Sequence, residues 1–569
     1  MTARRRRVLP RHWTLPGRRT GRGAHTDPPA RQRPPGPPPP GPAERPGPPD
    51  PSGRPDPSGR PDPPGPRGPA EPPGPARADV PAPAPPGQEP VTDRTLRTTR
   101  TIVVLAATEI VGKLSTLVLV VGAARLLGPA DFGVFSYALA IGSLAAIVPL
   151  WAYDTTLVQR ASAEPRRLRA MLAALLAMRT VLVVLVFLVV LAIVGLAPPG
   201  GGGNVLGGLL VIAATLLDTF TETYRSAAAV MERQGIIAVV HLVQRLLTAA
   251  AALAALLADT GLLGLGVAYF AGTAVGPVLA ALMVRRAGVR PDWHALSRAE
   301  VADLNQGAWV IGLSNVVLIA LFRLDTVMLA GFAGSRAVGI YAAAYRLLET
   351  AVFVCWVVTR AIFPKMAADP APQRVRRLTE QGFGVLAAAF VPYMTVLLCR
   401  GHDILRVLYG PEFADAGTVM LDWLAPAPLL FGLAFLAGFA ILAAGPTVRV
   451  LVSSLVALAS NVLLNLLLMP RYGGAAAAFT TTLSYAVQGA TLIVLGRARA
   501  GVPRVGRVGL PAVAGSAAAA VPLLAPWPLL PALLAALVVY LPCWALTARR
   551  VDPKQVQVLR GLFRRGRTA

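Results

Sequence analysis

The feature that most constrains this chain is a series of apolar stretches, each about 20 residues or longer, that recur from residue 101 onward. As a helix, such a stretch crosses the roughly 30 Å hydrocarbon layer of a membrane. A transmembrane β-strand needs only about half that length, so the stretches exclude a closed barrel. Only 15% of the residues are charged and the mean hydropathy is +0.55, whereas soluble domains carry about 25% charged residues. The pattern predicts an all-α multi-pass membrane protein with about 14 transmembrane helices.

Glycine, proline and charged residues between the apolar stretches set the limits of the expected spans. The first six are near 101–124, 132–153, 170–197, 205–229, 235–258 and 261–284, and the next six near 306–332, 337–363, 381–399, 418–444, 447–469 and 473–496. Two more are expected near 508–526 and 527–547, where five prolines also allow a re-entrant or broken segment. The longest loops are expected near 285–305 and 400–417.

The distribution of Lys and Arg over the loops gives an independent test of these spans, because cytoplasmic loops collect positive charge. With the N-terminus in the cytoplasm, the expected inner loops and flanks hold 28 Lys and Arg and the outer loops hold 5. Loops rich in Lys and Arg alternate with loops poor in them along all the expected spans, so both termini are predicted to be cytoplasmic. The net charge of +26 is thereby explained by membrane topology, and no nucleic acid partner is expected.

An internal repeat relates the two halves of the membrane part. The segment GPADFGVFSYA at 128–138 aligns with GSRAVGIYAAA at 334–344, an offset of 206 residues, and Gly261 has a counterpart in Gly473. Six helices separate the copies, so the halves have the same orientation and are related by an axis along the membrane normal. The repeat predicts two parallel six-helix halves, as in an alternating-access transporter with a substrate path between the halves, followed by two additional C-terminal helices.

These observations divide the chain into six parts. They are a disordered Pro/Arg-rich cytoplasmic tail at 1–95, an N-terminal six-helix bundle at 96–284, a cytoplasmic linker at 285–305, a C-terminal six-helix bundle at 306–505, two more helices at 506–548 and a basic cytoplasmic tail at 549–569.

Insertion of a charged residue at the middle of a membrane costs about 2.5 to 3.5 kcal/mol. Charged residues inside the spans are therefore expected to face a cavity or to form ion pairs. Five basic residues are candidates for a cationic cavity: Lys113, Arg179, Arg225, Arg245 and Arg346. Four acidic residues are candidates for coupling to H⁺ or Na⁺: Glu109, Asp218, Glu222 and Glu349. The alternative for each pair at helical spacing, such as Glu222 with Arg225 or Arg346 with Glu349, is that the two charges only neutralise each other.

Nothing in the sequence predicts catalysis or a cofactor. Cys355, Cys399 and Cys543 lie far apart and have no metal-ligand spacing. The expected loops are too short to hold a catalytic domain, and an enzyme is not expected.

Four motifs carry a resemblance to a known family. They are ARLLGPADFGVFSYALAI at 124–141, DTVMLAGFAGSRAVGIYAAAYRLLE at 325–349 with FPKMA at 363–367, VLYGPEF at 407–413 and NLLLMPRYGGAAAAF at 465–479. Together they resemble the polysaccharide biosynthesis (Wzx-type) flippases of the multidrug/oligosaccharidyl-lipid/polysaccharide (MOP) superfamily. The resemblance covers residues 96 to about 505.

The resemblance implies a fold of two pseudosymmetric six-helix bundles around a central cavity that is open to one side at a time. It also implies a transporter of undecaprenyl-pyrophosphate-linked oligosaccharide, moved from the inner to the outer leaflet of a bacterial plasma membrane. The partners it implies are membrane lipids, the lipid-linked oligosaccharide and a polysaccharide polymerase or glycosyltransferases. Two alternatives share the fold: a MATE-like exporter of drugs or cations, and a flippase for lipid II, the peptidoglycan precursor. A cation exporter should have an acidic cavity, whereas bases at least equal acids here.

Overall fold

The computed structural model describes residues 91–196, 205–306, 308–445 and 448–551, and nearly all of them are helical. The first part of the chain contains α1 (Val91–Ala145), α2 (Ile147–Leu150), α3 (Tyr153–Ala163), the 3₁₀ turn η1 (Pro165–Arg167), α4 (Leu168–Leu196), α5 (Val205–Val230), α6 (Gln234–Leu257), α7 (Gly261–Arg286) and α8 (Arg298–Asn305). The second part contains α9 (Ala308–Ala368), α10 (Pro372–Tyr409), α11 (Pro411–Leu424), α12 (Ala427–Ala443), α13 (Val448–Ala500), α14 (Val505–Leu524) and α15 (Leu529–Val551). The predicted all-α membrane fold is confirmed.

Both predicted tails fall largely outside the described residues. Helix α1 begins at Val91, before the predicted end of the N-terminal tail, and α15 ends at Val551. The linker predicted at 285–305 contains the last two residues of α7 and the short helix α8.

Three long helices contain a sharp kink at a glycine in the left-handed region of backbone conformation. The φ angles are 72° at Gly128 in α1, 76° at Gly334 in α9 and 51° at Gly473 in α13. Each kink lies where a short loop between two spans was predicted, and a residue with a side chain is disfavoured at such φ values. Gly128 and Gly334 are the two positions aligned by the repeat.

The described residues contain 11 segments long and apolar enough to cross a membrane. The three with kinks are 54, 58 and 51 residues long, and each is long enough for two crossings of about 20 residues. Counted in that way the segments agree with about 14 crossings, although the number of crossings stays a prediction.

Two predicted spans are broken, and one predicted loop is helical. The second span is interrupted before α3, where Trp151 has a φ of 34°. The tenth is divided into α11 and α12. The loop predicted at 400–417 was wrong: α10 continues beyond an irregular residue, Arg400, and Gly410 with a φ of 106° turns the chain directly into α11. Pro411 begins α11, a position where its missing N–H costs nothing.

The last two helices are separate, α14 continues through Pro511 and Pro522, and each of the two is long and apolar enough to cross a membrane. Helices α14 and α15 pack on each other, and α14 also packs on α10. Arg400 of α10 donates hydrogen bonds to the carbonyl oxygens of Ala525 and Trp527, in the turn between the two helices. The Arg400 guanidinium thus connects the turn between α14 and α15 to α10.

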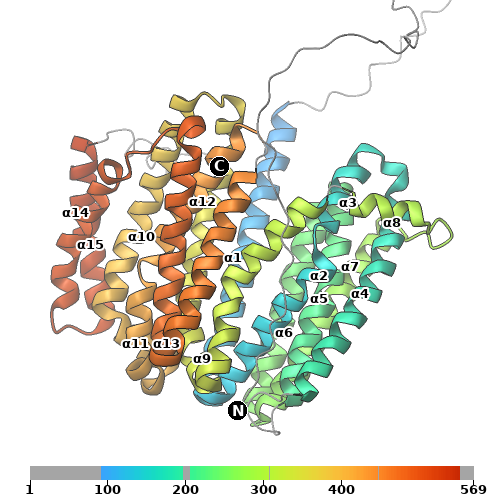
Figure 1. Cartoon of the computed structure of the whole chain (residues 1–569), viewed down its shortest axis with the longest axis horizontal. Coiled ribbons are helices and arrows are strands. Elements are labelled where there is room, and N and C mark those ends of the chain that lie inside the picture. Colours follow the sequence, from blue (N-terminus) through green and yellow to red (C-terminus); the bar gives the residue numbers. More distant parts are fainter. Residues whose placement is uncertain (1–90, 197–204, 307, 446–447, 552–569) are drawn as a thin grey trace, which may run out of the picture. The chain divides into compact units, whose positions relative to one another are not determined.

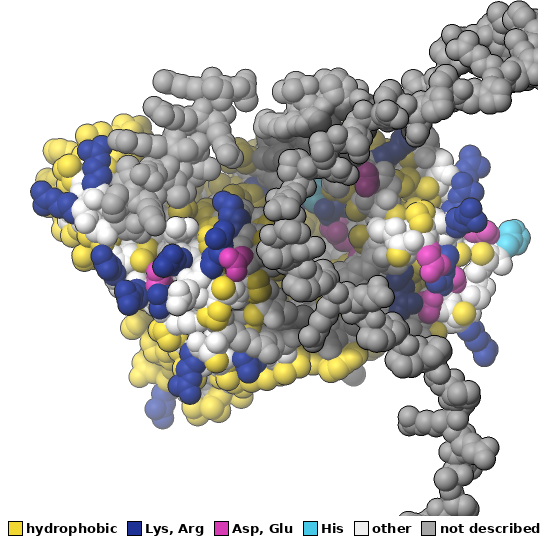
Figure 2. All heavy atoms as spheres, turned by 90° about the horizontal axis from the view of Figure 1, so that it is seen from above, with side chains coloured by type: hydrophobic (Ala, Val, Ile, Leu, Met, Phe, Trp, Pro, Cys, Tyr) yellow, Lys and Arg dark blue, Asp and Glu magenta, His cyan; other side chains and the backbone are white. Residues whose placement is uncertain are grey.

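The first and ninth helices form the contact between the two predicted halves. Figure 1 shows α1 and α9 in the middle, with α4 to α7 on one side and α10 to α15 on the other. Helix α1 packs on α9 and on α5 and α6, while α9 also packs on α12 and α13. Figure 2 shows many Lys and Arg side chains on one face of the protein, with hydrophobic side chains along the left and lower parts of the view.

Ion pairs hold helix α8 against η1 and α3. Arg167 contacts Glu300 at 3.0 Å and Asp303 at 2.6 Å, and Arg160 contacts Asp303 at 3.1 Å. The hydrogen bond from Arg167 lowers the pKa of the Asp303 carboxyl. These contacts attach the predicted linker to η1 and α3.

Candidate functional site

Glu349, in the second segment of α9, is the centre of a group of positive charges. Its two carboxylate oxygens each contact one guanidinium, Arg323 at 2.8 Å and Arg346 at 2.8 Å. Lys113 of α1 also acts electrostatically on this carboxylate. Three cations, Arg323, Arg346 and Lys113, therefore act on the Glu349 carboxylate.

The same group extends to the N-terminal half of the chain. The ammonium nitrogen of Lys113 lies 4.6 Å from the centre of the Phe353 ring in α9. Arg245 of α6 lies against α1, because a Cβ placed on Gly112 would be 2.9 Å from its Cδ. The partly buried Tyr269 of α7 experiences the charges of Arg245, Arg323 and Arg346. Lys113 and Arg245 come from α1 and α6 of the N-terminal half, whereas Arg323 and Arg346 come from α9 of the C-terminal half.

Asp218 of α5 is the second acid of the group. Its Oδ1 accepts a hydrogen bond of 2.7 Å from Nε2 of Gln244, next to Arg245 in α6, and its charge also acts on Tyr269. We call the six residues the central cationic cluster: Lys113, Arg245, Arg323, Arg346, Glu349 and Asp218. These six described side chains are four cations and two carboxylates, a formal excess of two positive charges among the six, and both predicted halves contribute to the cluster.

Two of the pairings expected within a helix are present. Arg225 contacts Glu222 at 2.5 Å and Arg346 contacts Glu349 at 2.8 Å. Arg225 and Glu222 are each partly exposed, and the charge of Asp218 acts on Glu222. Asp218, Glu222 and Arg225 thus follow one another along α5, and the last two lie beyond the cluster. The side chain of Glu109 lies outside the described residues, and no ion-coupling role of the four acids is tested by these contacts.

Arg179 has a different environment from the other four candidate bases. It is completely buried and contacts Asp154 of α3 at 2.7 Å. It also donates hydrogen bonds to the carbonyl oxygens of Pro149 and Thr219 and to the Thr223 hydroxyl. All these partners belong to the N-terminal half. Arg179 joins α3, α4 and α5, and its predicted role in substrate binding stays a prediction that this geometry does not favour.

A close backbone contact joins the two kinked helices. A Cβ on Gly133 would lie 1.8 Å from the Ser335 carbonyl oxygen, and a Cβ on Gly339 would lie 2.0 Å from the Pro129 carbonyl oxygen. Gly133 and Gly339 are equivalent by the 206-residue offset of the repeat, and so are Pro129 and Ser335. The glycine of each half therefore contacts the equivalent residue of the other half. We call this the glycine contact.

Side chains around the glycine contact also join the two halves. Arg125 of α1 donates to the carbonyl oxygens of Val407 and Leu408 in α10. The rings of Phe132 and Phe413 meet edge to face, with centroids 6.0 Å apart. This end of the α1–α9 contact is therefore tightly closed.

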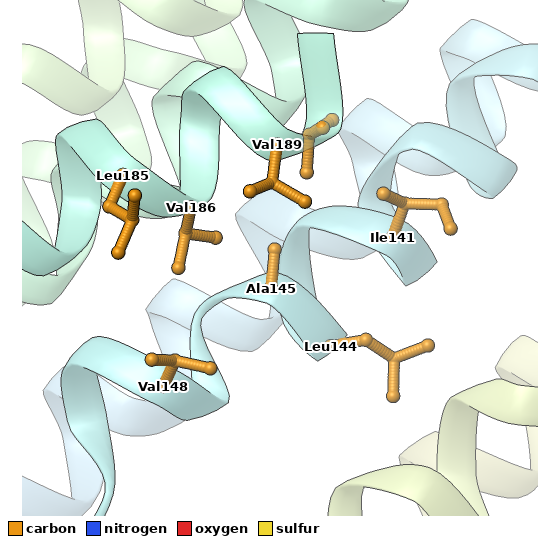
Figure 3. Close-up of a pocket in the computed structure, with 8 residues that line it drawn as sticks. Ile141, Leu144, Ala145, Val148, Leu185, Val186 and Val189 are labelled. Atoms are coloured by element: carbon orange, nitrogen blue, oxygen red, sulfur yellow. The ribbon is translucent and has the colours of Figure 1, made fainter. Parts of the chain in front are cut away.

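An apolar cavity of about 340 Å³ lies between α4 on one side and the second segment of α1 with α2 on the other (Figure 3). Its lining is aliphatic: Ile141, Leu144, Ala145, Val148, Leu185, Val186, Val189 and Val190. Such a surface offers no hydrogen-bond donor to a polar headgroup, so the cavity is suited to a hydrocarbon chain and not to a charged group.

Two charged residues were not included among the candidate site residues, although the sequence criterion applies to them. Arg323 and Asp325 are charged residues inside a predicted span, the criterion that selected the other candidates. Neither has an oppositely charged residue three or four positions away, and the pairing of Arg323 with Glu349 joins residues 26 positions apart. Only the fold shows that Arg323 belongs to the central cationic cluster.

Comparison with known families supports the predicted relationship. The model of a family described as "Polysaccharide biosynthesis protein" matches residues 98–368. This part of the chain resembles that family. The match begins in α1 and ends at the last residue of α9, so it contains the glycine contact and every residue of the central cationic cluster. Within residues 98–368 the predicted resemblance is confirmed, and the motifs at 407–413 and 465–479 lie outside the matched part.

A curated relative and two solved structures are similar over different lengths. "Probable flippase AglR" of Haloferax volcanii is 28% identical over 216 residues, which span 37% of this chain and 45% of that protein. The lipid II flippase MurJ, in an inward closed conformation, has a TM-score of 0.66 at 13% identity and covers 79% of this chain and 99% of its own. A MATE family multidrug resistance transporter of the MOP superfamily, inward-facing, has a TM-score of 0.55 at 13% identity and covers 72% and 98%. The fold is therefore similar to those of MurJ and of this MATE transporter, and the chain spans less than half the length of the curated relative.

Proposed function

We propose that this protein is a flippase that moves undecaprenyl-pyrophosphate-linked oligosaccharide from the inner to the outer leaflet of a bacterial cell membrane. The observation that carries the proposal is the central cationic cluster, because its residues come from both halves of a MOP-type fold. The description of the matching family and the printed name of the curated relative, a probable flippase, support the same activity.

The chemistry of the cluster fits a pyrophosphate-linked headgroup. Two linked phosphates carry at least two negative charges, and the cluster has a formal excess of two positive charges. Arg245, Arg323 and Arg346 present planar guanidinium groups that can donate two hydrogen bonds to one phosphate. Binding inside a region of low dielectric strengthens each of these interactions relative to water.

The arrangement of the halves supports transport by alternating access. A substrate bound by the cluster contacts α1 and α6 on one side and α9 on the other, so relative motion of the halves changes its exposure. The glycine contact closes one end of the α1–α9 interface. Opening this contact while closing the opposite end would expose the cluster to the other side of the membrane.

The two alternatives differ in what the cluster should contain. A cation exporter of the MATE type needs a site with an excess of acids, which the central cationic cluster does not have. A lipid II flippase would carry the same pyrophosphate and needs the same cations, so the headgroup distinguishes it from the proposed function.

The decisive experiment is depletion of the protein followed by mass spectrometry of the accumulated polyprenyl lipids. We expect a pyrophosphate-linked oligosaccharide that differs from lipid II. Accumulation of lipid II would favour the second alternative, and accumulation of no pyrophosphate lipid would contradict the proposal.

A single substitution tests the cluster itself. Arg245→Ala should abolish export of the surface glycan, because it removes one of the guanidinium groups that would bind the phosphates. Arg233→Ala, at an exposed arginine before α6, is the matched control and should export normally. Both variants should be present in the membrane at wild-type amounts, as checked by immunoblotting. Normal glycan export in Arg245→Ala would exclude a binding role for this residue.

A further inference from the structure

A row of aromatic rings begins one residue before Arg323 in the sequence. Phe322 of α9 meets Phe431 of α12 with the ring centroids 5.5 Å apart. Along α12 the centroids of Phe431 and Phe435 lie 5.4 Å apart, and those of Phe435 and Phe439 lie 5.0 Å apart. Distances of this size are typical of aromatic side chains in contact. The rings therefore form a continuous row from the first segment of α9 along α12.

The second segment of α9 adds two rings to this row. Trp356 contacts Phe435 at 4.6 Å and Phe363 contacts Phe439 at 5.1 Å, again measured between ring centroids. Phe431 is 3% exposed, whereas Trp356 is 38% exposed. The row is thus tightly packed at Phe431 and accessible at Trp356. We call the six side chains the aromatic row: Phe322, Phe431, Phe435, Phe439, Trp356 and Phe363.

Trp356 lies on the face of α9 that carries Glu349. Seven residues make almost two full turns of an α-helix, so the two side chains point about 20° apart and are separated by about 10 Å along the axis. Phe353, four positions after Glu349, lies on this face as well, and its ring centre is 4.6 Å from the ammonium nitrogen of Lys113 in α1. This face therefore borders the N-terminal half. Trp356 lies beyond the central cationic cluster, toward the end of α9 that is predicted to be cytoplasmic.

Arg360 continues the same face four positions after Trp356. Its side chain is exposed, and no carboxylate in the described part of the chain forms an ion pair with it. A guanidinium carries five N–H donors in a planar arrangement. An accessible indole and a guanidinium one helical turn apart therefore lie on the face that borders the N-terminal half.

A sugar ring matches this pair of groups. One face of a pyranose carries mainly C–H groups, and its edge carries hydroxyl groups. The face of an aromatic ring carries partial negative charge, which attracts polarised C–H groups. A guanidinium donates hydrogen bonds to hydroxyl oxygens or to the carboxylate of an acidic sugar. Ligand sites commonly combine aromatic walls with a few polar groups of this kind.

We propose that Trp356 and Arg360 form a subsite for the saccharide of the transported lipid, with Phe435 packed against the Trp356 ring. A pyrophosphate at the central cationic cluster and a sugar at Trp356 are then about 10 Å apart along α9, a distance that a short oligosaccharide spans. The subsite lies on the predicted cytoplasmic side of the cluster, from which the substrate enters. It rests on the proposed function and extends it from the pyrophosphate to the sugar.

Two ligands that differ only in the saccharide test the subsite. One is the pyrophosphate-linked oligosaccharide that accumulates when the protein is depleted, and the other is undecaprenyl pyrophosphate. Binding of each ligand to the purified protein in detergent is measured by thermophoresis. Trp356→Ala and Arg360→Ala should each weaken binding of the oligosaccharide lipid by about tenfold and leave binding of undecaprenyl pyrophosphate unchanged. Arg245→Ala should weaken binding of both ligands, because both carry the pyrophosphate.

Trp423→Ala is the matched control, since Trp423 of α11 is 47% exposed and contacts a ring outside the aromatic row, that of Phe479. It should bind both ligands as the wild-type protein does. Trp356→Phe keeps an aromatic ring and should retain most of the affinity for the oligosaccharide lipid. This variant separates loss of the ring from disturbance of the fold.

Equal affinity of the wild-type protein for the two ligands would overturn the subsite even if no variant folded. An equal loss for both ligands in Trp356→Ala would also overturn it. Unchanged binding of both ligands in that variant would do the same, and would leave Trp356 as an anchor at the membrane interface. Absence of binding of either ligand to the wild-type protein would contradict the proposed function, and the subsite with it.

Discussion

Partners decide what a charged residue inside the membrane can do, and only some partners are visible in the sequence. Glu222 with Arg225 and Arg346 with Glu349 are three positions apart, so helical spacing predicted both pairs. The partner of Arg179 is Asp154 of another helix. Sequence reasoning grouped Arg179 with the cavity because no acid lies on its own helix face, and it could not see that α3 supplies one.

The environment of Arg179 predicts a loss of stability. Arg179→Ala leaves the Asp154 carboxylate without its ion pair and removes the donor to the carbonyl oxygens of Pro149 and Thr219. Removing one partner of a buried pair costs about 3 to 5 kcal/mol. The variant should unfold at a clearly lower temperature than wild type when the detergent-solubilised protein is heated and followed by size-exclusion chromatography.

The control for this measurement is Arg166→Ala, at an exposed arginine of η1, which should unfold at the wild-type temperature. Equal unfolding temperatures for Arg179→Ala and Arg166→Ala would show that the buried network does not stabilise the protein. A cavity role for Arg179 would then regain support.

Turns between helices were easier to predict than the breaks within them. Gly128, Gly334 and Gly473 have positive φ values, a conformation that glycine adopts without strain, and all three were expected between spans. The break at Trp151 has no such signal, because a tryptophan with a φ of 34° is held there by tertiary contacts. Its carbonyl oxygen accepts from Asn315 of α9, and its ring lies against Gly312.

The glycine contact predicts equal effects of two substitutions 206 residues apart. Gly133→Ala and Gly339→Ala each place a methyl group against a backbone carbonyl of the other half. Overpacking of this kind costs about 1 to 3 kcal/mol, so each variant should shift the conformational equilibrium away from the closed contact by roughly tenfold. A cysteine introduced at Val338, which is completely buried, should then react faster with a maleimide.

Gly331→Ala is the matched control for these variants, since a Cβ at that position meets nothing within 4 Å. It should leave both the labelling rate and glycan export unchanged. If Gly133→Ala and Gly339→Ala label at the control rate, the close approach of α1 and α9 is not required for closure at this end.

At the scale of the whole molecule, the sequence predicted more of the arrangement than of the site. Apolar length predicted the membrane helices, and the repeat predicted that Gly128 and Gly334 are equivalent. Neither pattern could predict that the repeated segments contact each other at Gly133 and Gly339, because a repeat shows similarity and not proximity. The central cationic cluster depends on that contact, since it unites residues of α1 and α6 with residues of α9.

Orientation in the membrane can be tested with single cysteines in a background where Cys355, Cys399 and Cys543 are replaced by alanine. The distribution of Lys and Arg places the α7–α8 linker in the cytoplasm and the α10–α11 turn outside. Arg290→Cys and Glu412→Cys put exposed thiols at these two places. In intact cells a membrane-impermeant maleimide should label only the cysteine at position 412, and the one at 290 should react after permeabilisation. The reverse labelling pattern would show that the protein has the opposite orientation in the membrane. The glycine contact would then close the cytoplasmic end, and the proposed direction of transport would lose its structural basis.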